Sequence, residues 1–311
     1  MEQNFYQYMM YSECLRRVEK DGLLLKYITR QDLNLCLAAV KNNPRALQYS
    51  QYQSEEICLT AVSQCGDMLK YVHDKKENIC LSALNNEGLA IRYISNPTEE
   101  MILTAVNQNG FALKHISQQN YKICEAAINN NPFALKYVLN KTLELCLLAV
   151  RADGNSLQYI TCKNDFIYHE AIKSNPEAIQ YIFQPSSEII SLAIKKKPYV
   201  IKYLKDCSNA IWLEAIKKNT SVIKFLKKPD ENLIKYAIKR NPTAIKYIQE
   251  PSEKLCRFAI SLDYEVLALI KEQKESVCLY ALSKSRNAIH YIKKKYMTDL
   301  LKKHYVELYG G

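Results

Sequence analysis

The segment Ala39-Val40-Lys41-Asn42-Asn43-Pro44-Arg45-Ala46-Leu47-Gln48-Tyr49 recurs along this chain with a period of 22 residues. A second copy is Ala171-Ile172-Lys173-Ser174-Asn175-Pro176-Glu177-Ala178-Ile179-Gln180-Tyr181. The period holds without a slip over thirteen units. An internal period of this length is typical of a repeat architecture, in which each unit buries its apolar face against its neighbours.

Aligned on this period, the units share three apolar columns. The first column is tyrosine at Tyr27, Tyr49, Tyr71, Tyr93, Tyr137, Tyr159, Tyr181, Tyr203, Tyr247 and Tyr291, and it is completed by His115, Phe225 and Leu269. An aliphatic residue stands two positions earlier in every unit, from Leu25 to Ile289. The third column is alanine at Ala39, Ala61, Ala83, Ala105, Ala127, Ala149, Ala171, Ala193, Ala215, Ala237, Ala259 and Ala281. We expect this alanine to mark a close contact between helices.

Each unit is predicted to contain two helices. The first follows a capping column that includes Asp32, Ser54, Thr98, Asn120 and Thr142, whose side chains can accept hydrogen bonds from first-turn amides. The second is short, about two turns, and has Pro or Gly at its first position, as at Pro44 and Gly66. Prolines are otherwise confined to the junction before the next cap, at Pro97, Pro185, Pro229 and Pro251.

The predicted fold class is therefore all-α, an α-solenoid superhelix of about thirteen 22-residue helix-turn-helix repeats. We expect a single domain over residues 1–311. Within it, residues 1–12 form an N-terminal cap, residues 12–295 form the repeats, and residues 296–311 form an amphipathic C-terminal capping helix. A two-turn helix is not stable alone, so stacking must supply the stability of the array.

The two quoted segments resemble short helical repeats of unknown function that are numerous in giant DNA viruses of amoebae and in some bacteria. The resemblance covers about residues 12–295. It implies a helical-repeat fold and a viral origin, and it brings no catalytic residues and no known ligand. A composition rich in Lys, Asn, Ile and Tyr agrees with an AT-rich genome.

Composition restricts the class of protein further. The chain is 48% hydrophobic and 24% charged, which is typical of a folded chain. It has no apolar run long enough for a membrane span and no signal-peptide pattern near Met1. We therefore expect an intracellular protein, either cytoplasmic or, if viral, in the host cytoplasm or the virion, and not a secreted one. Its net charge of +11 lies entirely in residues 151–311, which favours an acidic partner for that half.

No pattern of catalytic residues is evident. Eight of the eleven cysteines share one column, in which Ile102, Ile190, Trp212 and Ile234 also occur, so we interpret the column as core packing. Metal or redox chemistry at these cysteines is the weaker alternative. The five histidines are scattered, and no phosphate-binding loop or hydrolase motif is present. We expect no enzyme activity, no cofactor, no metal site and no small-molecule substrate.

Two surface features are candidate binding sites. The first is a protein-binding patch on the second helices of three consecutive units, formed by Leu89, Arg92, Phe111, Lys114, Phe133 and Lys136. Apolar residues rimmed by cations are typical of protein interfaces. The alternative is that the apolar side chains pack against neighbouring repeats.

The second feature is a basic stripe at the ends of the first helices. It consists of Arg151, Lys173, Lys195, Lys196, Lys217, Lys218, Lys239 and Arg240. Such a stripe could bind nucleic acid or an acidic protein, but cations at helix C-termini are favourable in any case. The leading functional hypothesis is a non-enzymatic scaffold for protein–protein interaction, and the alternative is a nucleic-acid-binding solenoid that uses residues 151–311.

Overall fold

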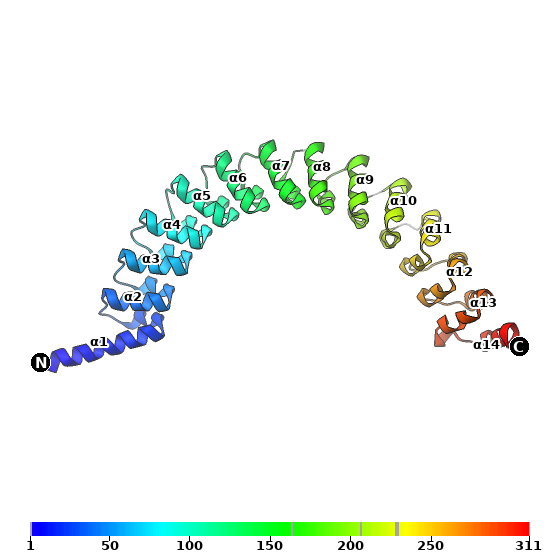
Figure 1. Cartoon of the computed structure of the whole chain (residues 1–311), viewed down its shortest axis with the longest axis horizontal. Coiled ribbons are helices and arrows are strands. Elements are labelled where there is room, and N and C mark those ends of the chain that lie inside the picture. Colours follow the sequence, from blue (N-terminus) through cyan, green and yellow to red (C-terminus); the bar gives the residue numbers. More distant parts are fainter. Residues whose placement is uncertain (1, 163, 206, 228–229, 311) are drawn as a thin grey trace. The chain divides into compact units, whose positions relative to one another are not determined.

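The computed structural model describes residues 2–162, 164–205, 207–227 and 230–310, and side chains from residue 10 onward. Every regular element among these residues is a helix (Figure 1). The chain is thus a helical-repeat solenoid, as the period predicts. It divides into two compact units, Met1–Ser174 and Asn175–Gly311, and we describe each by itself.

Unit 1 alternates α-helices with six-residue 3₁₀-helices (η). Its elements are α1 (Glu2–Lys20), η1 (Gly22–Tyr27), α2 (Leu33–Asn42), η2 (Pro44–Tyr49), α3 (Glu55–Gln64), η3 (Gly66–Tyr71), α4 (Glu77–Asn86), η4 (Gly88–Tyr93), α5 (Glu99–Gln108), η5 (Gly110–His115), α6 (Tyr121–Asn130), η6 (Pro132–Tyr137), α7 (Leu143–Ala152), η7 (Gly154–Tyr159) and α8 (Asp165–Ser174). Each α-helix contacts the next α-helix and each η helix the next η helix, so the unit has two rows.

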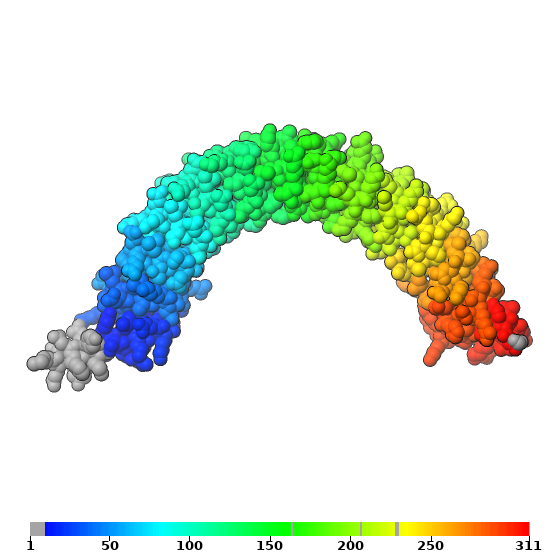
Figure 2. All heavy atoms as spheres, in the orientation of Figure 1, coloured from blue at the N-terminus to red at the C-terminus, as the bar shows by residue number. Residues whose placement is uncertain are grey.

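Unit 2 continues the same alternation. Its elements are η8 (Pro176–Tyr181), α9 (Ser187–Lys196), η9 (Pro198–Tyr203), α10 (Asn209–Lys218), η10 (Thr220–Phe225), α11 (Glu231–Arg240), η11 (Pro242–Tyr247), α12 (Glu253–Leu262), η12 (Tyr264–Leu269), α13 (Glu275–Lys284), η13 (Arg286–Tyr291), η14 (Lys294–Tyr296) and α14 (Asp299–Tyr309). Within each unit, consecutive repeats lie against one another in the space-filling view (Figure 2).

The second helix of each repeat has the predicted length, but its geometry is 3₁₀. Its amides bond three residues back, as in Ala46 N–H to Asn43 O (2.9 Å) and Ser50 N–H to Leu47 O (3.1 Å). Six residues make two 3₁₀ turns, in which side chains at i and i+3 eclipse one another. This geometry places the residue after the Pro/Gly column directly beside the residue three positions later.

The predicted caps are confirmed at most repeats. Asp32, Ser54, Thr98, Asn120 and Thr142 each accept the amide three residues ahead, at 2.8 to 3.4 Å. The η helices are capped in the same manner by Asn43, Asn131, Asn175 and Asn241, which accept the amide two residues ahead. Pro229, one of the junction prolines, lies outside the described residues.

The N-terminal end agrees with expectation, and the C-terminal helix differs in detail. The expected N-terminal cap is continuous with the first repeat helix, because α1 runs to Lys20. The closing helix is α14, and it begins at Asp299. Leu301 is fully buried in it, whereas Leu300 and Leu308 remain about half exposed, so its buried face is narrow.

The core consists of the columns identified in the sequence. All twelve alanines of the alanine column are fully buried. The aliphatic column is buried from Leu25 to Leu267, and Ile289 is half-buried. In four repeats a β-carbon added to the Gly that begins the η helix would overlap the carbonyl oxygen of the alanine in the following repeat, as Gly22 would with Ala39. Neighbouring repeats therefore approach each other to backbone contact at this point.

A side-chain amide in the following repeat satisfies the amide of these glycines. Gly22 N–H donates to Asn42 Oδ1 at 2.7 Å, and Asn42 Nδ2 donates to Glu19 O at 2.9 Å. We call this bidentate arrangement the turn clamp. It recurs at Asn86, Gln108 and Asn130. It ties the turn of one repeat to the α-helix of the next.

A second tie joins the loops that follow the η helices. Gln31 Nε2 donates to Tyr49 O of the next repeat at 3.0 Å, and Gln31 Oε1 accepts Gln51 N–H at 2.9 Å. We call this the loop clamp, and Gln53, Gln119 and Gln273 repeat it. The clamps satisfy loop backbone groups that would otherwise lose their partners on burial.

The loop clamp also explains the cysteine column. The thiols of Cys36, Cys58 and Cys124 donate to the glutamine oxygen five residues earlier, at 3.2 to 3.9 Å. Seven of the eight cysteines of the column are buried and Cys14 is half-buried, and all are free thiols. Core packing is confirmed for this column, with a weak hydrogen bond as an additional contribution.

We predict that Ala149→Leu lowers the free energy of unfolding by about 1–3 kcal/mol, because a larger side chain must force two close helices apart. Urea unfolding followed by circular dichroism measures the effect. Ala152→Leu, an exposed site on the same helix, is the matched control. Equal midpoints for the two variants would mean that the alanine column is not a close helix contact.

We also predict that Asn130→Ala lowers the free energy of unfolding by about 1–3 kcal/mol, because it leaves the buried Gly110 amide without its partner. The adjacent Asn129→Ala removes the same side chain from an exposed position and should have little effect. If both variants unfold at the same urea concentration, the turn clamp does not contribute to stability.

Candidate functional site

The exposed side of the η helices carries three columns of chemically varied side chains. The first is the position after the Pro/Gly column, the second lies three residues later, and the third is the tyrosine column. We call this surface the ladder face. Its first column varies most, with Asp67, Phe111 and Ser221 among its members.

Contacts between repeats join the columns of the ladder face. The first-column ring of Phe111 meets Tyr137 of the next repeat edge-on, with centroids 6.1 Å apart and planes at 88°. Phe133 meets Tyr159 in the same geometry at 6.3 Å. This T-shaped arrangement is favourable for aromatic pairs, so these two rings are held against the tyrosine of the following repeat.

The second column adds cations to these rings. The ammonium or guanidinium group lies 4.5 to 5.5 Å from the centroid of the neighbouring ring for Lys26, Lys70, Arg92, Lys136, Lys202, Lys224 and Lys246. A cation over a ring face gains about 0.5–1 kcal/mol at exposed sites. Most tyrosines of the column are half-buried, and Tyr27 is 72% exposed.

The residues of the predicted patch all lie on the ladder face of unit 1. Leu89, Phe111 and Phe133 are half-buried, while the cations Arg92, Lys114 and Lys136 are exposed. The apolar side chains therefore both pack against neighbours and reach the surface. Tyr137 and Tyr159, which support the two phenylalanines, were not included in the predicted patch.

Arg92 belongs to a second cluster centred on Asp67. The Asp67 carboxylate accepts the Tyr93 hydroxyl at 2.9 Å, pairs with Lys70 at 3.3 Å, and also pairs with Arg92. Burial disfavours ionisation of Asp67, but hydrogen bonds from Tyr93, Arg92 and Lys70 outweigh it and lower the pKa of the carboxyl group. This carboxylate offsets half of the positive charge of the two cations around it.

His115 replaces tyrosine in the third column. Burial and the nearby cations Lys114 and Arg92 lower its pKa, so it is neutral near pH 7. The positive charge of the patch therefore comes from lysine and arginine alone.

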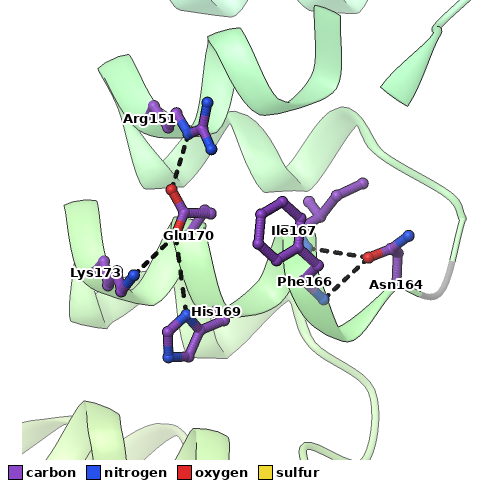
Figure 3. A network of polar contacts seen from close by, with 7 residues as sticks. All are labelled: Arg151, Asn164, Phe166, Ile167, His169, Glu170 and Lys173. Carbon is purple, nitrogen blue, oxygen red and sulfur yellow. Dashed lines mark hydrogen bonds and ion pairs between the residues drawn. The ribbon is translucent and has the colours of Figure 1, made fainter. Parts of the chain in front are cut away.

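The first two members of the predicted basic stripe lie in unit 1 and share a carboxylate. Glu170 pairs with Arg151 at 2.8 Å and with Lys173 at 3.0 Å, as Figure 3 shows. Hydrogen bonds from Arg151 and Lys173 lower the pKa of Glu170. These two cations are thus engaged within the chain.

The other six members of the stripe lie in unit 2. Lys195, Lys196, Lys217, Lys218, Lys239 and Arg240 occupy the last turns of α9, α10 and α11 and are exposed. Arg240 donates to the carbonyl oxygen of Lys217 at 3.2 Å, which joins two of these helix ends. Among the described residues, Lys195, Lys217 and Lys239 pair with no carboxylate.

The described part of the chain contains no group of three or more His, Cys, Asp or Glu side chains that could hold a metal ion. No helix there is both long enough and apolar enough to cross a membrane.

Comparison with known proteins adds one local likeness. A family model described as "Domain of unknown function (DUF4116)" matches residues 98–143. That segment spans two repeats, from the cap of α5 to the first residue of α7, and includes Phe111 and Phe133. No curated protein matches the chain.

The Asp67 cluster predicts a pH-dependent stability. The pKa of Asp67 is lowered by folding, so its contribution is complete above the unfolded value of about 3.9 and is lost as pH falls through the folded value. Asp67→Asn should therefore lower the melting temperature at pH 5–8. The difference from the unmodified protein should shrink below about pH 4.

Thermal unfolding at a series of pH values measures this difference. Asp74→Asn, at an exposed carboxylate in the loop after η3, is the control and should show a smaller difference. A pH-independent effect of Asp67→Asn would mean that charge does not account for the stabilisation.

Proposed function

We propose that this chain is a non-enzymatic scaffold that binds a protein partner through the ladder face of unit 1. The contact is centred on Leu89, Phe111 and Phe133, with Arg92, Lys114 and Lys136 at its rim. The observation that carries the proposal is the fixed yet accessible position of the two phenylalanine rings. Each is half-buried and braced by a tyrosine of the next repeat.

Bracing of this kind favours binding. A side chain that is already ordered loses less conformational entropy when a partner covers it. Aromatic anchors surrounded by polar residues are also the usual hot spots of protein interfaces. No cofactor, small-molecule substrate or membrane is part of the proposed function.

The resemblance to repeats of giant DNA viruses supports a viral origin, with a host or viral protein as the partner. An intracellular location, in the cytoplasm, the host cytoplasm or the virion, agrees with free thiols at every cysteine. A nucleic-acid-binding solenoid is the second candidate. The observation in its favour is the charge of residues 151–311, with 28 Lys and Arg against 17 Asp and Glu.

The test is a pull-down with mass spectrometry from extracts of cells that make the protein, run with and without nuclease. Replacing Leu89, Phe111 and Phe133 by Ser should remove the partner, because it removes the apolar anchors. Tyr264→Ser is the control, since Tyr264 makes a similar edge-on contact with Tyr291 in unit 2. It should retain the partner.

The two candidate functions give opposite results. One result would favour nucleic-acid binding. The partner would still be recovered with the Leu89, Phe111 and Phe133 variant, but would be lost on nuclease treatment and on changing Lys173, Lys195, Lys217 and Lys239 to Gln. Direct nucleic-acid binding would also weaken steeply as salt is raised.

A further inference from the structure

The positive charge of this protein belongs to unit 2. Residues 175–311 contain 25 Lys and Arg and 14 Asp and Glu, whereas residues 1–174 contain 18 of each. Unit 1 is therefore neutral by count, and on its ladder face one acid lies among the cations. There Asp67 lies between Lys70, Arg92 and the Tyr93 hydroxyl.

The same four positions recur in unit 2 without the acid. Seven repeats further along the chain, Lys224 corresponds to Lys70, Lys246 to Arg92 and Tyr247 to Tyr93. Ser221 stands where unit 1 has Asp67. Both cations and the phenol are retained, and the carboxylate that would bind them is missing.

The geometry of this second quartet matches the first. Lys246 lies 5.0 Å from the centroid of the Tyr247 ring, as Arg92 lies 4.8 Å from that of Tyr93. Lys224 lies 5.0 Å from the rings of both Tyr199 and Phe225. A hydrogen bond from Ser221 lowers the pKa of Tyr247, and Lys246 and Lys224 lower it further. The phenol therefore lies in a positive environment that stabilises negative charge.

Four carboxylates of the surrounding repeats have partners of their own. Glu177 pairs with Lys197, and Glu231 pairs with Lys235, both at 2.8 Å. Glu214 accepts the Ser191 hydroxyl at 2.8 Å. Asp230 caps α11 and accepts Asn209. Among the described residues, neither Lys224 nor Lys246 forms an ion pair with an acid.

We propose that Ser221, Lys224, Lys246 and Tyr247 form a binding site for an Asp or Glu side chain of an acidic segment in a partner protein. The partner's carboxylate would pair with both lysines and accept the Tyr247 hydroxyl, as Asp67 does within unit 1. The Ser221 side chain carries no charge and hydrogen-bonds to Tyr247, so both lysines are left to the ligand's carboxylate. The inference rests on the proposed scaffold function, and it specifies the chemistry of a second contact with the partner.

The rings of this region favour a peptide over nucleic acid. Non-specific single-strand binding needs open ring faces on which bases can stack. Here Lys224 occupies ring faces of Tyr199 and Phe225, and these two rings meet edge-on at 83°. The charge of Lys224 remains available to a carboxylate, whereas Lys224 itself covers part of the ring surface on which a base could stack.

The test is a fluorescence-anisotropy titration of the full chain with a fluorescein-labelled peptide of alternating glutamate and glycine, at about 0.15 M ionic strength. The unmodified chain should bind it, and Ser221→Asp should weaken binding roughly tenfold or more by filling the site from within. Asn287→Asp is the matched control. It makes the same charge change at the same column position in η13, away from the quartet, and should bind nearly as the unmodified chain does.

A second pair of variants separates the site from general attraction. Lys224→Gln with Lys246→Gln should abolish most binding. Lys217→Gln with Lys239→Gln removes equal charge from the α-helix ends and should retain most of it. Circular dichroism before each titration confirms that the variants are folded.

Three results would overturn the proposal. They are no binding of the peptide by the unmodified chain, equal weakening by Ser221→Asp and Asn287→Asp, and tighter binding of a labelled oligothymidylate that Ser221→Asp also blocks. The last result would assign the quartet to phosphate. None of these depends on the pull-down with the Leu89, Phe111 and Phe133 variant, so failure of the proposed function and failure of this site are distinguishable.

Discussion

Close approach between successive repeats is the constraint on which the other features depend. Where a Gly begins an η helix, its Cα lies against the carbonyl of the buried alanine in the next repeat, and a β-carbon would overlap that oxygen. At this separation a side chain larger than alanine does not fit, and the glycine amide is out of reach of water. The amide therefore needs a partner in the protein, because an unpaired buried donor costs about 1–3 kcal/mol. Asn42, Asn86, Gln108 and Asn130 supply that partner.

The same requirement explains a correlation between two positions of the repeat. Where Gly begins the η helix, the residue twenty positions later is Asn, Gln or Ser, and Ser174 accepts Gly154 N–H at 3.2 Å. Where Pro begins it, that residue is Ala152, Lys196, Lys218 or Leu262 in four repeats, and Gln64 in the repeat after Pro44. Gln64 keeps only the donor half of the clamp, from its Nε2 to Val40 O at 3.3 Å. Proline has no amide to satisfy, so the acceptor is unnecessary. Gly in one repeat thus requires an acceptor side chain in the next repeat, whereas Pro removes that requirement.

The period, the buried columns and the caps could be predicted from sequence, because each depends on residues within one unit. The 3₁₀ geometry could not, since six residues between boundary signals suit a short helix of either kind. Contacts that bridge repeats were also missed. Asp67 meets Arg92 and Tyr93, and Glu170 meets Arg151, only because of how adjacent layers are offset. The clamps did leave a signal, namely the pairing of Gly with Asn or Gln, which is evident once the layer contact is known.

This division of roles leaves the ladder face free to vary. The clamps and the alanine contact hold the repeats together, and they use no residue of the first ladder column. Asp67, Phe111 and Ser221 occupy equivalent positions on 3₁₀-helices of equal length. The carboxylate of Asp67 pairs with the neighbouring cations, and the ring of Phe111 packs on the next tyrosine. The small hydroxyl of Ser221 leaves the neighbouring lysines without an acid. One substitution in this column therefore changes the charge and the accessible surface of a repeat while the clamps and the alanine contact stay in place, so binding properties can diverge repeat by repeat.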